Sequence, residues 1–373
     1  MSTPPRKEDC RGGRPGDADR RIDPPPIEPG MSVGDLVGKH YLAYNAARLR
    51  EASLVMSEKM LAGDGLVILT LAGALTPAGL GASCVVPLLE AGLVDVVIST
   101  GANLFHDLHH GLDLRLERGS PFGDDRELRR LRKVRIYDVI LDFDVLDKTD
   151  WFVRDIVAAM PPDAIGTADL HNRLGRAVLD RAGTTGRADK SLLAVAARLD
   201  VPVYSASPGD SAIGMVVAAR RLTGRGPVVD PSKDVNELAA FVWDAKRSGR
   251  TTGVVILGGG APKNFALQTA PHLEEVLYLR RPGGFGLDYF VQFTDARPDT
   301  GGLSGATPSE AVSWGKLLPE RIPDSVVCYV DATVAFPLVT AAVLDAGRRR
   351  APKRLYAARA ETVAALAAAC AAK

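Results

Sequence analysis

The sequence predicts an α/β fold in which a parallel, Rossmann-like sheet carries helices on both faces. Short apolar runs alternate along the chain with longer segments of helical periodicity. The runs are continuously apolar, as in strands buried on both faces of a parallel sheet, and each ends in Gly, Ser, Thr or Asp. Ligands of such sheets bind outside the carboxyl ends of the strands. We therefore expect the residues after each run to form the wall of a site.

The first predicted element is a helix over Gly34–Leu61, where apolar residues recur at roughly helical spacing. The first strand should lead into a small-residue loop, Ala72–Gly79, and then a helix that ends at Glu90. The second should lead into a loop at Thr100–Asn103 and another helix. An alanine-rich helix over Ala351–Lys373 ends the chain. The expected strands are Leu66–Leu71, Val94–Ser99, Val201–Ala206, Val254–Leu257, Tyr289–Phe293 and Val326–Val330.

Composition predicts one large domain after a short polar tail. Residues 1–30 hold Pro, Arg, Asp and Gly with almost no large apolar side chains, which is typical of a disordered segment. Residues 31–373 form the expected single α/β catalytic domain, and single domains of this length occur.

Charge and cysteine usage exclude several classes of partner. The net charge of +1 gives no electrostatic footprint for nucleic acid. No apolar run approaches the roughly 18 residues that a membrane span needs. The amino-terminal residues lack an apolar signal core, so we expect a cytoplasmic protein. The four cysteines show no metal or disulfide spacing, and Cys84 and Cys328 should pack as small hydrophobic side chains.

The segment Ser304–Lys316, SGATPSEAVSWGK, carries the clearest chemical signal. It places Lys316 beside Trp314, with Glu310 upstream. A lysine is a nucleophile only when neutral, and an apolar pocket lowers its pKa. Such a lysine can form a Schiff base, and an indole face can hold a cationic amine. On composition alone, an exposed lysine at a helix end is the simpler interpretation.

A glycine-rich turn follows the fourth predicted strand. Gly258, Gly259 and Gly260 lead directly into Ala261-Pro262-Lys263, a plausible helix start. Glycines let the backbone approach a pyrophosphate, and a helix amino terminus favours its charge. A plain tight turn explains this stretch equally well, and the GxGxxG dinucleotide fingerprint is missing.

Three histidines stand together at helical spacing. His106, His109 and His110 lie at i, i+3 and i+4, with Asp107 between them. This spacing suits zinc, and it suits a solvated or capping cluster equally. No second group of ligands stands out elsewhere in the sequence, so we expect no metal.

Several blocks, in order and spacing, resemble the deoxyhypusine synthase family over about residues 30 to 347. The specific blocks are SWGK at Ser313–Lys316 and DATVAFPL at Asp331–Leu338. The others are VDVVISTGANLFHD at Val94–Asp107, VYSASPGDSAIG at Val203–Gly214 and VVILGGG at Val254–Gly260. The resemblance implies a deoxyhypusine synthase-like fold with NAD as cofactor, and a lysine, here Lys316, that carries a 4-aminobutyl group as an imine.

The resemblance also implies the cofactor residues. It makes His106 the candidate for a proton-handling group near the nicotinamide. Asp210 and Asp331 follow strands, where an acid can bind ribose hydroxyls or simply cap a helix, and the family assigns them to the cofactor. The implied cofactor set is Gly73, Ala74, Leu75, Thr100, Gly101, Asp210, Gly258, Gly259, Gly260, Ser304, Asp331, Ala332 and Thr333.

The implied amine site departs from the pattern of members that use spermidine. The matching residues are Glu310 and Trp314, with Gly301 in the glycine-rich segment before them. The changed positions are Met215 and Leu303 in place of Asp, Asn264 in place of His, and Gln268 in place of Asn. Because each desolvated ammonium needs a partner, the loss of two carboxylates favours a shorter, less charged or differently arranged amine. Asp295 and Asp299 are near enough in sequence to compensate.

The resemblance thus implies an NAD-dependent 4-aminobutyl transferase. The replacements in the amine site favour a small acceptor such as putrescine, which would give homospermidine. The acceptor could instead be a lysine of a translation factor. An inert NAD-binding homologue and a plain amine oxidoreductase are further alternatives. Family members build homotetramers with sites between paired subunits, so we expect a homo-oligomer.

Overall fold

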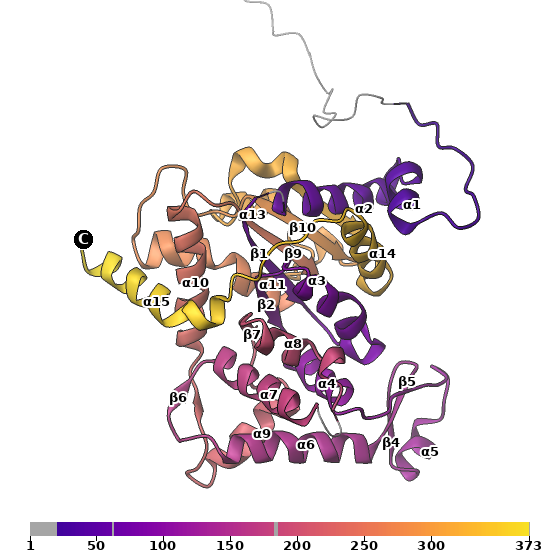
Figure 1. The fold of residues 1–373 in the computed structure, drawn as a ribbon, viewed down its shortest axis with the longest axis vertical. Coiled ribbons are helices and arrows are strands. Elements are labelled where there is room, and N and C mark those ends of the chain that lie inside the picture. Colours follow the sequence, from indigo (N-terminus) through magenta and orange to yellow (C-terminus); the bar gives the residue numbers. More distant parts are fainter. Residues whose placement is uncertain (1–20, 62, 183–185, 373) are drawn as a thin grey trace, which may run out of the picture.

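A computed structural model describes residues 21–61, 63–182 and 186–372. Its centre is a sheet of six parallel strands in the order β11-β10-β9-β1-β2-β7, with helices on both faces (Figure 1). This confirms the predicted Rossmann-like parallel sheet. The strands are β1 (Leu66–Leu71), β2 (Val96–Ser99), β7 (Val203–Ser205), β9 (Thr252–Leu257), β10 (Tyr289–Thr294) and β11 (Ser325–Tyr329).

The strand order places a topological switch between β1 and β9. From β1 the chain builds outward through β2 to β7, then returns to the other side of β1 and builds outward through β10 to β11. Leu71 pairs with Leu257, so β1 and β9 end level with each other. The loops that follow these strands then diverge to opposite sides, which leaves a crevice for a ligand at their carboxyl ends.

Side-chain alternation along the strands feeds two hydrophobic cores. In β1, Leu66 and Ile68 enter one core, and Val67 and Leu69 enter the other. On the side of Val67 the core is completed by α2 (Tyr44–Leu54), α3 (Val86–Glu90), α4 (Gly101–Gly111), α8 (Leu192–Arg198), α9 (Ala212–Arg221) and α14 (Ala332–Asp345). On the side of Leu66 it is completed by α10 (Pro231–Arg247), α11 (Gly260–Leu267) and α15 (Leu355–Ala371).

Three predicted boundaries were wrong. The expected helix over residues 34–61 is two helices, α1 (Val33–His40) and α2, with a π-helical turn after α2. The break follows from the backbone, because Tyr44 adopts a φ of 55°. The loop expected at residues 100–103 is shorter, because Thr100 caps α4 and the helix begins at Gly101. The last helix begins at Leu355.

A segment between β2 and β7 was not predicted. It contains β3 (Glu117–Arg118), α5 (Asp125–Arg130), β4 (Lys133–Ile136), β5 (Val139–Asp142), α6 (Phe143–Ala158), β6 (Ala164–Ile165) and α7 (Thr167–Arg181). Strands β3, β5 and β4 form a small antiparallel sheet. Its strands are partly exposed, so they lack the continuous apolar runs that mark the main sheet.

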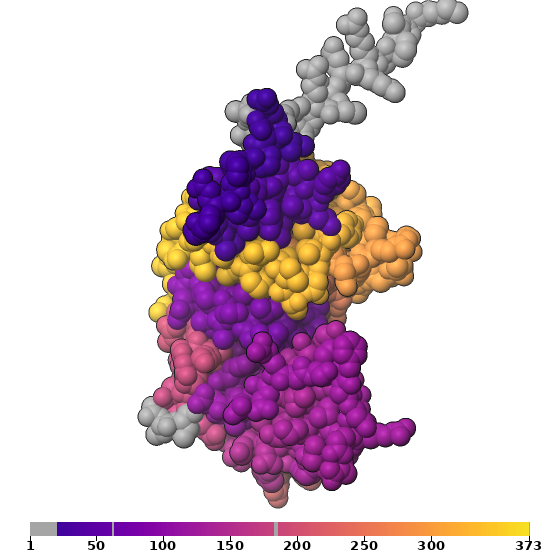
Figure 2. Space-filling model, turned by 90° about the vertical axis from the view of Figure 1, so that its right-hand side faces the viewer, coloured from indigo at the N-terminus to yellow at the C-terminus, as the bar shows by residue number. Residues whose placement is uncertain are grey.

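Figure 2 shows this inserted segment at the opposite end of the molecule from α1 and α2, which pack on α14. Of the expected tail over residues 1–30, residues 1–20 lie outside the described residues. Residues 21–30 are exposed and form no helix or strand. Within the described residues, no helix is long and apolar enough to span a membrane.

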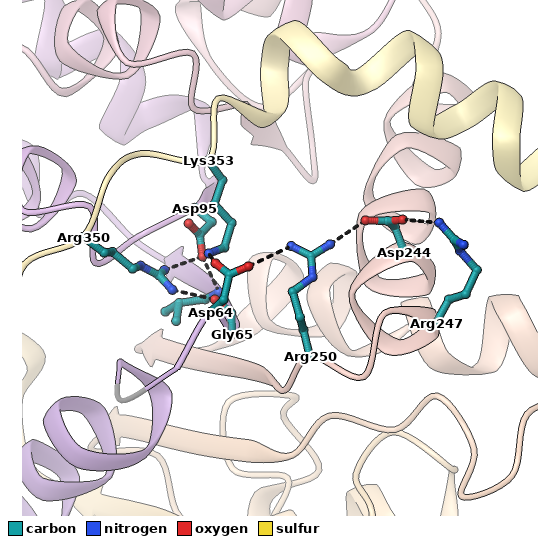
Figure 3. Close-up of polar contacts among 9 residues, drawn as sticks. Asp64, Gly65, Asp95, Asp244, Arg247, Arg250, Arg350 and Lys353 are labelled. Carbon is teal, nitrogen blue, oxygen red and sulfur yellow. Dashed lines mark hydrogen bonds and ion pairs between the residues drawn. The ribbon is translucent and has the colours of Figure 1, made fainter.

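A partly buried arginine ties the carboxy-terminal segment to the amino edge of the sheet (Figure 3). Arg350 donates to Asp95 Oδ2 at 2.5 Å and to the carbonyl oxygens of Gly65 at 2.6 Å and Gly92 at 2.5 Å. Asp95 also accepts from Val67 N at 2.8 Å. Burial raises the pKa of the Asp95 carboxyl, and Arg350 opposes that shift. This group of contacts, the Arg350 clamp, joins the starts of β1 and β2 to the residues before α15.

Exposed ion pairs extend the clamp toward α10 (Figure 3). Lys353 pairs with Asp64, and Asp64 lies 3.8 Å from Arg250. Arg250 in turn pairs with Asp244 on α10 at 2.5 Å. The amino edge of the sheet is therefore closed by charge pairs, which leaves the carboxyl edge as the place for a site.

We expect Arg350→Ala to lower the free energy of unfolding by about 3–5 kcal/mol, because it leaves the buried Asp95 carboxylate unpaired. Urea unfolding measures the change. The control is Arg198→Ala, which breaks an exposed pair with Glu90 and should cost less than about 1 kcal/mol. Adding Asp95→Asn to Arg350→Ala should recover part of the loss. Equal effects of the two arginine variants would contradict the assignment.

Candidate functional site

Two cavities lie at the carboxyl edge of the sheet. The first, the switch-point cavity, has a volume of about 240 Å³ and lies where the loops after β1, β2 and β7 meet the start of α11. Its lining residues are Ala72, Gly73, Ser99, Thr100, Gly101, Ala206, Ser207, Asp210, Gly260, Ala261 and Pro262. The structure therefore brings the predicted cofactor residues Gly73, Thr100, Gly101, Asp210 and Gly260 together.

The switch-point cavity fits the phosphates of a dinucleotide. Glycine backbones at Gly73, Gly101 and Gly260 line it, and the amino termini of α4 and α11 both begin there. Gly73 and Gly260 have φ values of 66° and 57°, which glycine adopts without strain. The positive ends of two helix dipoles at such a place favour an anion.

The loop after β1, which carries Ala74 and Leu75, is held to the start of α4 by hydrogen bonds. Asn103 Oδ1 accepts from Leu75 N at 2.6 Å and from Thr76 N at 3.1 Å. Thr100 Oγ1 donates to the carbonyl oxygen of Gly73 at 2.6 Å. Asn103 was missed from the sequence, because its role depends on a loop 28 positions away.

The central glycine of the turn is required by a contact within the chain. A Cβ at Gly259 would lie 2.5 Å from Ser304 Cα. The close approach of the Ser304 segment therefore requires glycine here. Ser304 Oγ also accepts from Gly260 N at 3.1 Å, which joins the segment to the start of α11.

The second cavity, the lysine cavity, has a volume of about 280 Å³ and brings most of the predicted amine site together. It is lined by Lys263, Asn264, Leu267, Gln268, Leu303, Ala306, Thr307, Glu310, Ala311, Trp314 and Lys316. Of the described residues that line it, Glu310 alone carries a carboxylate. The cavity is therefore poor in negative charge for a site that would hold a polycation.

Lys316 is held at one wall of the lysine cavity. Its Nζ donates to Asn264 Oδ1 at 3.0 Å and lies 5.5 Å from the centre of the Trp314 ring. Its backbone is fixed because its N–H donates to Ala311 O at 2.9 Å and its C=O accepts from Leu287 N at 3.0 Å. Burial lowers the pKa of Lys316, and the nearby Glu310 carboxylate opposes this. A lowered pKa increases the fraction of neutral, nucleophilic amine.

The helix before Lys316 explains the position of Glu310. Thr307 caps α13 (Pro308–Ser313), and its Oγ1 accepts from Glu310 N at 3.2 Å. Pro308 occupies the first helical position, where a missing N–H costs nothing. This local sequence fixes the backbone at Glu310, whose side chain then lines the cavity.

Two buried residues that the sequence did not reveal link the cavities. Gln292 Oε1 accepts from Lys263 Nζ at 3.0 Å, and Gln292 Nε2 donates to the carbonyl oxygens of Gly258 at 2.8 Å and Ser304 at 2.7 Å. Lys263 Nζ also donates to Ala306 O at 2.7 Å. Burial lowers the pKa of Lys263 to about 8. These contacts, the Gln292 bridge, fix the glycine turn against the segment that carries the lysine cavity.

The histidines form a hydrogen-bonded cluster. His106 Nδ1 and His109 Nε2 lie 3.0 Å apart, and His109 Nδ1 lies 2.8 Å from Thr149 Oγ1 on α6. His110 Nε2 faces Thr76 O at 3.0 Å. Within the described residues, no group of three His, Cys, Asp or Glu side chains could hold a metal ion. His106 itself lines neither cavity, but it belongs to the helix whose amino terminus does.

Other predicted residues lie outside both cavities within one chain. Met215, on α9, is 68% exposed, and Gly301 is exposed in the segment before α13. Asp331 acts as the cap of α14 and accepts from Thr333 N at 2.8 Å, with Ala332 between them. The suggested compensating acids, Asp295 and Asp299, line neither cavity, and Asp299 pairs with Arg297 at the surface.

Comparison with known proteins gives consistent results. The family model described as deoxyhypusine synthase matches residues 37–343. A deoxyhypusine synthase-like protein of Nostoc punctiforme is 52% identical over 338 residues, which cover 90% of this chain and 86% of that protein. A probable deoxyhypusine synthase 1 of Methanosarcina acetivorans is 35% identical over 329 residues, or 88% and 94% of the two chains.

A solved structure shares the fold. The crystal structure of a putative deoxyhypusine synthase from Entamoeba histolytica superposes with a TM-score of 0.53 at 15% identity. The superposition covers 88% of this chain and 99% of that one. The likeness therefore extends over the sheet and both helical layers.

We expect Asn264→Asp to raise the pKa of Lys316, because a carboxylate would replace the amide oxygen 3.0 Å from Nζ. The neutral amine would then appear at a higher pH, by about one unit or more. Reductive alkylation of Lys316 as a function of pH, read by peptide mass spectrometry, measures the shift. Asn264→Leu, which removes the acceptor without adding charge, should move the profile to lower pH. If both profiles match the wild type, Asn264 does not act on Lys316.

Proposed function

Because this chain belongs to the deoxyhypusine synthase family, we propose that it is a transferase that moves a 4-aminobutyl group through an imine on Lys316, with NAD as its bound cofactor. The observation that carries the proposal is the setting of Lys316, whose amine lies in a cavity against Asn264 and Trp314. The fit of the switch-point cavity to a dinucleotide supports the cofactor.

Each of the central residues of the lysine cavity has its own role in the proposed reaction. Neutral Lys316 attacks the imine carbon of the oxidised donor, and the leaving amine departs with its proton. The acceptor amine then displaces Lys316. Glu310 pairs with the ammonium end of a substrate, and the Trp314 ring offers a face for the same charge. Asn264 orients the lysine amine between attacks. NAD, when bound, supplies the hydride chemistry at the start and the end.

The polar groups of the cavity favour a small amine as acceptor, as in homospermidine synthesis from putrescine. Leu303, Asn264 and Gln268 line the cavity at positions where the resemblance gives spermidine-using members an Asp, a His and an Asn. Glu310 is the one carboxylate among the described residues that line the cavity. A triamine would therefore leave more of its ammonium groups without a carboxylate partner than a shorter amine would.

A second candidate is transfer to a protein lysine, as the family name implies. The observation in its favour is the exposed mouth of the lysine cavity, where Trp314 is 60% and Leu303 48% exposed. Such apolar exposure also suits a second copy of the chain, in keeping with a homotetramer whose sites lie between subunits. Product analysis decides between the two acceptors.

We expect borohydride, added with NAD and the correct donor amine, to trap a 4-aminobutyl adduct on the peptide that contains Lys316. The assay screens di- and triamines, and mass spectrometry locates the adduct. The control is Lys263→Arg, which keeps the cation of the Gln292 bridge and leaves Lys316 as the modified residue. Full transfer by Lys316→Ala would contradict the mechanism. Steady accumulation of NADH without aminobutyl product would indicate an oxidoreductase instead.

NAD should raise the melting temperature, since a ligand that binds only the native state stabilises it by about 2.7 kcal/mol at 100 times Kd. Gly259→Ala should abolish this shift, because its Cβ would push the Ser304 segment away from the start of α11, where Gly260 donates to Ser304 and lines the switch-point cavity. Gly38→Ala is the matched control, since a Cβ there meets nothing within 4 Å. An unchanged melting temperature of the wild type in saturating NAD would refute the cofactor assignment.

A further inference from the structure

A chain of hydrogen bonds runs from α6 to α4 through Thr149, His109 and His106. The side chains of Thr149 and His109 are fully buried, and that of His106 is partly exposed. Thr149 Oγ1 contacts both Val145 O at 2.9 Å and His109 Nδ1 at 2.8 Å. His109 Nε2 contacts His106 Nδ1 at 3.0 Å. Within the described part of the chain, no hydrogen bond reaches the last ring nitrogen, His106 Nε2.

The single proton of the Thr149 hydroxyl sets the direction of this chain. If it donates to Val145 O, His109 Nδ1–H donates to Thr149, and His106 Nδ1–H donates to His109 Nε2. All three contacts are then hydrogen bonds, and His106 Nε2 carries a bare lone pair. In the opposite direction Thr149 donates to His109, the contact with Val145 is lost, and His106 Nε2 carries the proton. The first direction makes one more buried hydrogen bond, so it is favoured.

The surroundings keep both rings neutral, as the chain requires. A doubly protonated imidazole has no acceptor nitrogen. Burial, with His110 nearby, lowers the pKa of His106 to about 4, and burial lowers the pKa of His109 to about 3. Phe105 packs its ring edge against both imidazoles, at 5.7 Å and 5.1 Å between centroids. His110 Nε2 is hydrogen-bonded to Thr76 O, and Lys190 adds a positive charge near His110.

We propose that Thr149 and His109 are positioning residues that hold His106 in its Nδ1-protonated tautomer, so that His106 Nε2 accepts a hydrogen bond from an N–H of a bound ligand that extends along α4 beyond the switch-point cavity, which the amino terminus of this helix lines. A histidine free to choose its tautomer would present a donor part of the time, and a donor repels an N–H. The hydrogen-bonded chain of Thr149, His109 and His106, here called the relay, fixes the tautomer before a ligand binds. The proposal rests on the proposed function for the identity of the ligand, but the tautomer is a property of the free protein.

Nitrogen-15 NMR of protein labelled at its six histidines tests the tautomer without any turnover. Protonated and bare ring nitrogens resonate far apart, and a His106→Gln variant assigns the signals. We expect His106 in the wild type to show a protonated Nδ1 and a bare Nε2. A protonated Nε2 in the wild type would overturn the proposal.

Thr149→Val and Thr149→Ser form a matched pair of variants. Valine keeps the shape but removes the acceptor for His109 Nδ1–H, so the chain should reverse and move the His106 proton to Nε2. Serine keeps the hydroxyl and should leave the tautomer unchanged. We expect kcat to fall about ten-fold or more in Thr149→Val, since His106 Nε2 changes from an acceptor to a donor, and to stay near wild type in Thr149→Ser.

The outcomes separate the relay from the proposed function. A wild-type tautomer in Thr149→Val would overturn the relay, and an unchanged kcat with a reversed tautomer would overturn the role of His106. If no amine is transferred by any form of the protein but the tautomer reverses as expected, the relay stands and the proposed function fails. A similar loss of activity in both variants would indicate a packing effect and overturn the positioning role.

Discussion

The two halves of the site are held at a fixed separation by the side chain of Gln292. Its amide is fully used, because Oε1 accepts from Lys263 and Nε2 donates to the carbonyl oxygens of Gly258 and Ser304. A buried amide that lost any of these partners would retain an unsatisfied polar group, at about 1–3 kcal/mol each. The glycine turn, the start of α11 and the Ser304 segment therefore have little freedom to move apart. The switch-point cavity and the lysine cavity are therefore held rigidly relative to each other.

The two edges of the sheet differ, because the amino edge is closed by charged contacts and the carboxyl edge is open to a ligand. At the amino edge, the Arg350 clamp pairs with Asp95 Oδ2 and with the carbonyl oxygens of Gly65 and Gly92 through partly buried charge-assisted bonds. At the carboxyl edge, backbone groups at Gly73 and Gly260 line a cavity. The topological switch between β1 and β9 explains why the crevice forms there, because the loops after these two strands leave in opposite directions.

What the sequence predicted well depended on local pattern or on short motifs. Runs such as Leu66–Leu71 are buried on both faces, so their apolar character marks them as strands. Trp314 and Lys316 share one motif, and the structure places both at the lysine cavity. The inserted segment between β2 and β7 was missed because its strands are partly exposed, and polar residues interrupt their apolar pattern.

The missed site residues are polar groups whose roles arise only from tertiary contacts. Lys263 and Gln292 are 29 positions apart, and nothing in their local sequence indicates that they bond. Thr149 reaches His109 across 40 positions, in a segment that sequence patterns left unassigned. Met215 stands at a position that the family resemblance assigns to the amine site, but it is exposed within one chain, so its role there stays a prediction. A motif fixes which residue stands at a position, whereas the fold of the chain and its partners decide what that residue faces.

If Lys316 is the nucleophile as proposed, the charge balance of the lysine cavity couples the binding of a substrate ammonium to the pKa of Lys316. Lys263 donates to Gln292 and to Ala306 O, so its charge is held in place. Lys316 has Glu310 as its nearby carboxylate, which favours the protonated amine. A substrate ammonium that pairs with Glu310 would take that support away and add a positive charge beside Lys316. Both effects lower the pKa of Lys316. The lysine would thus become most nucleophilic when an amine is bound, and it would remain protonated and unreactive for more of the time when the cavity is empty.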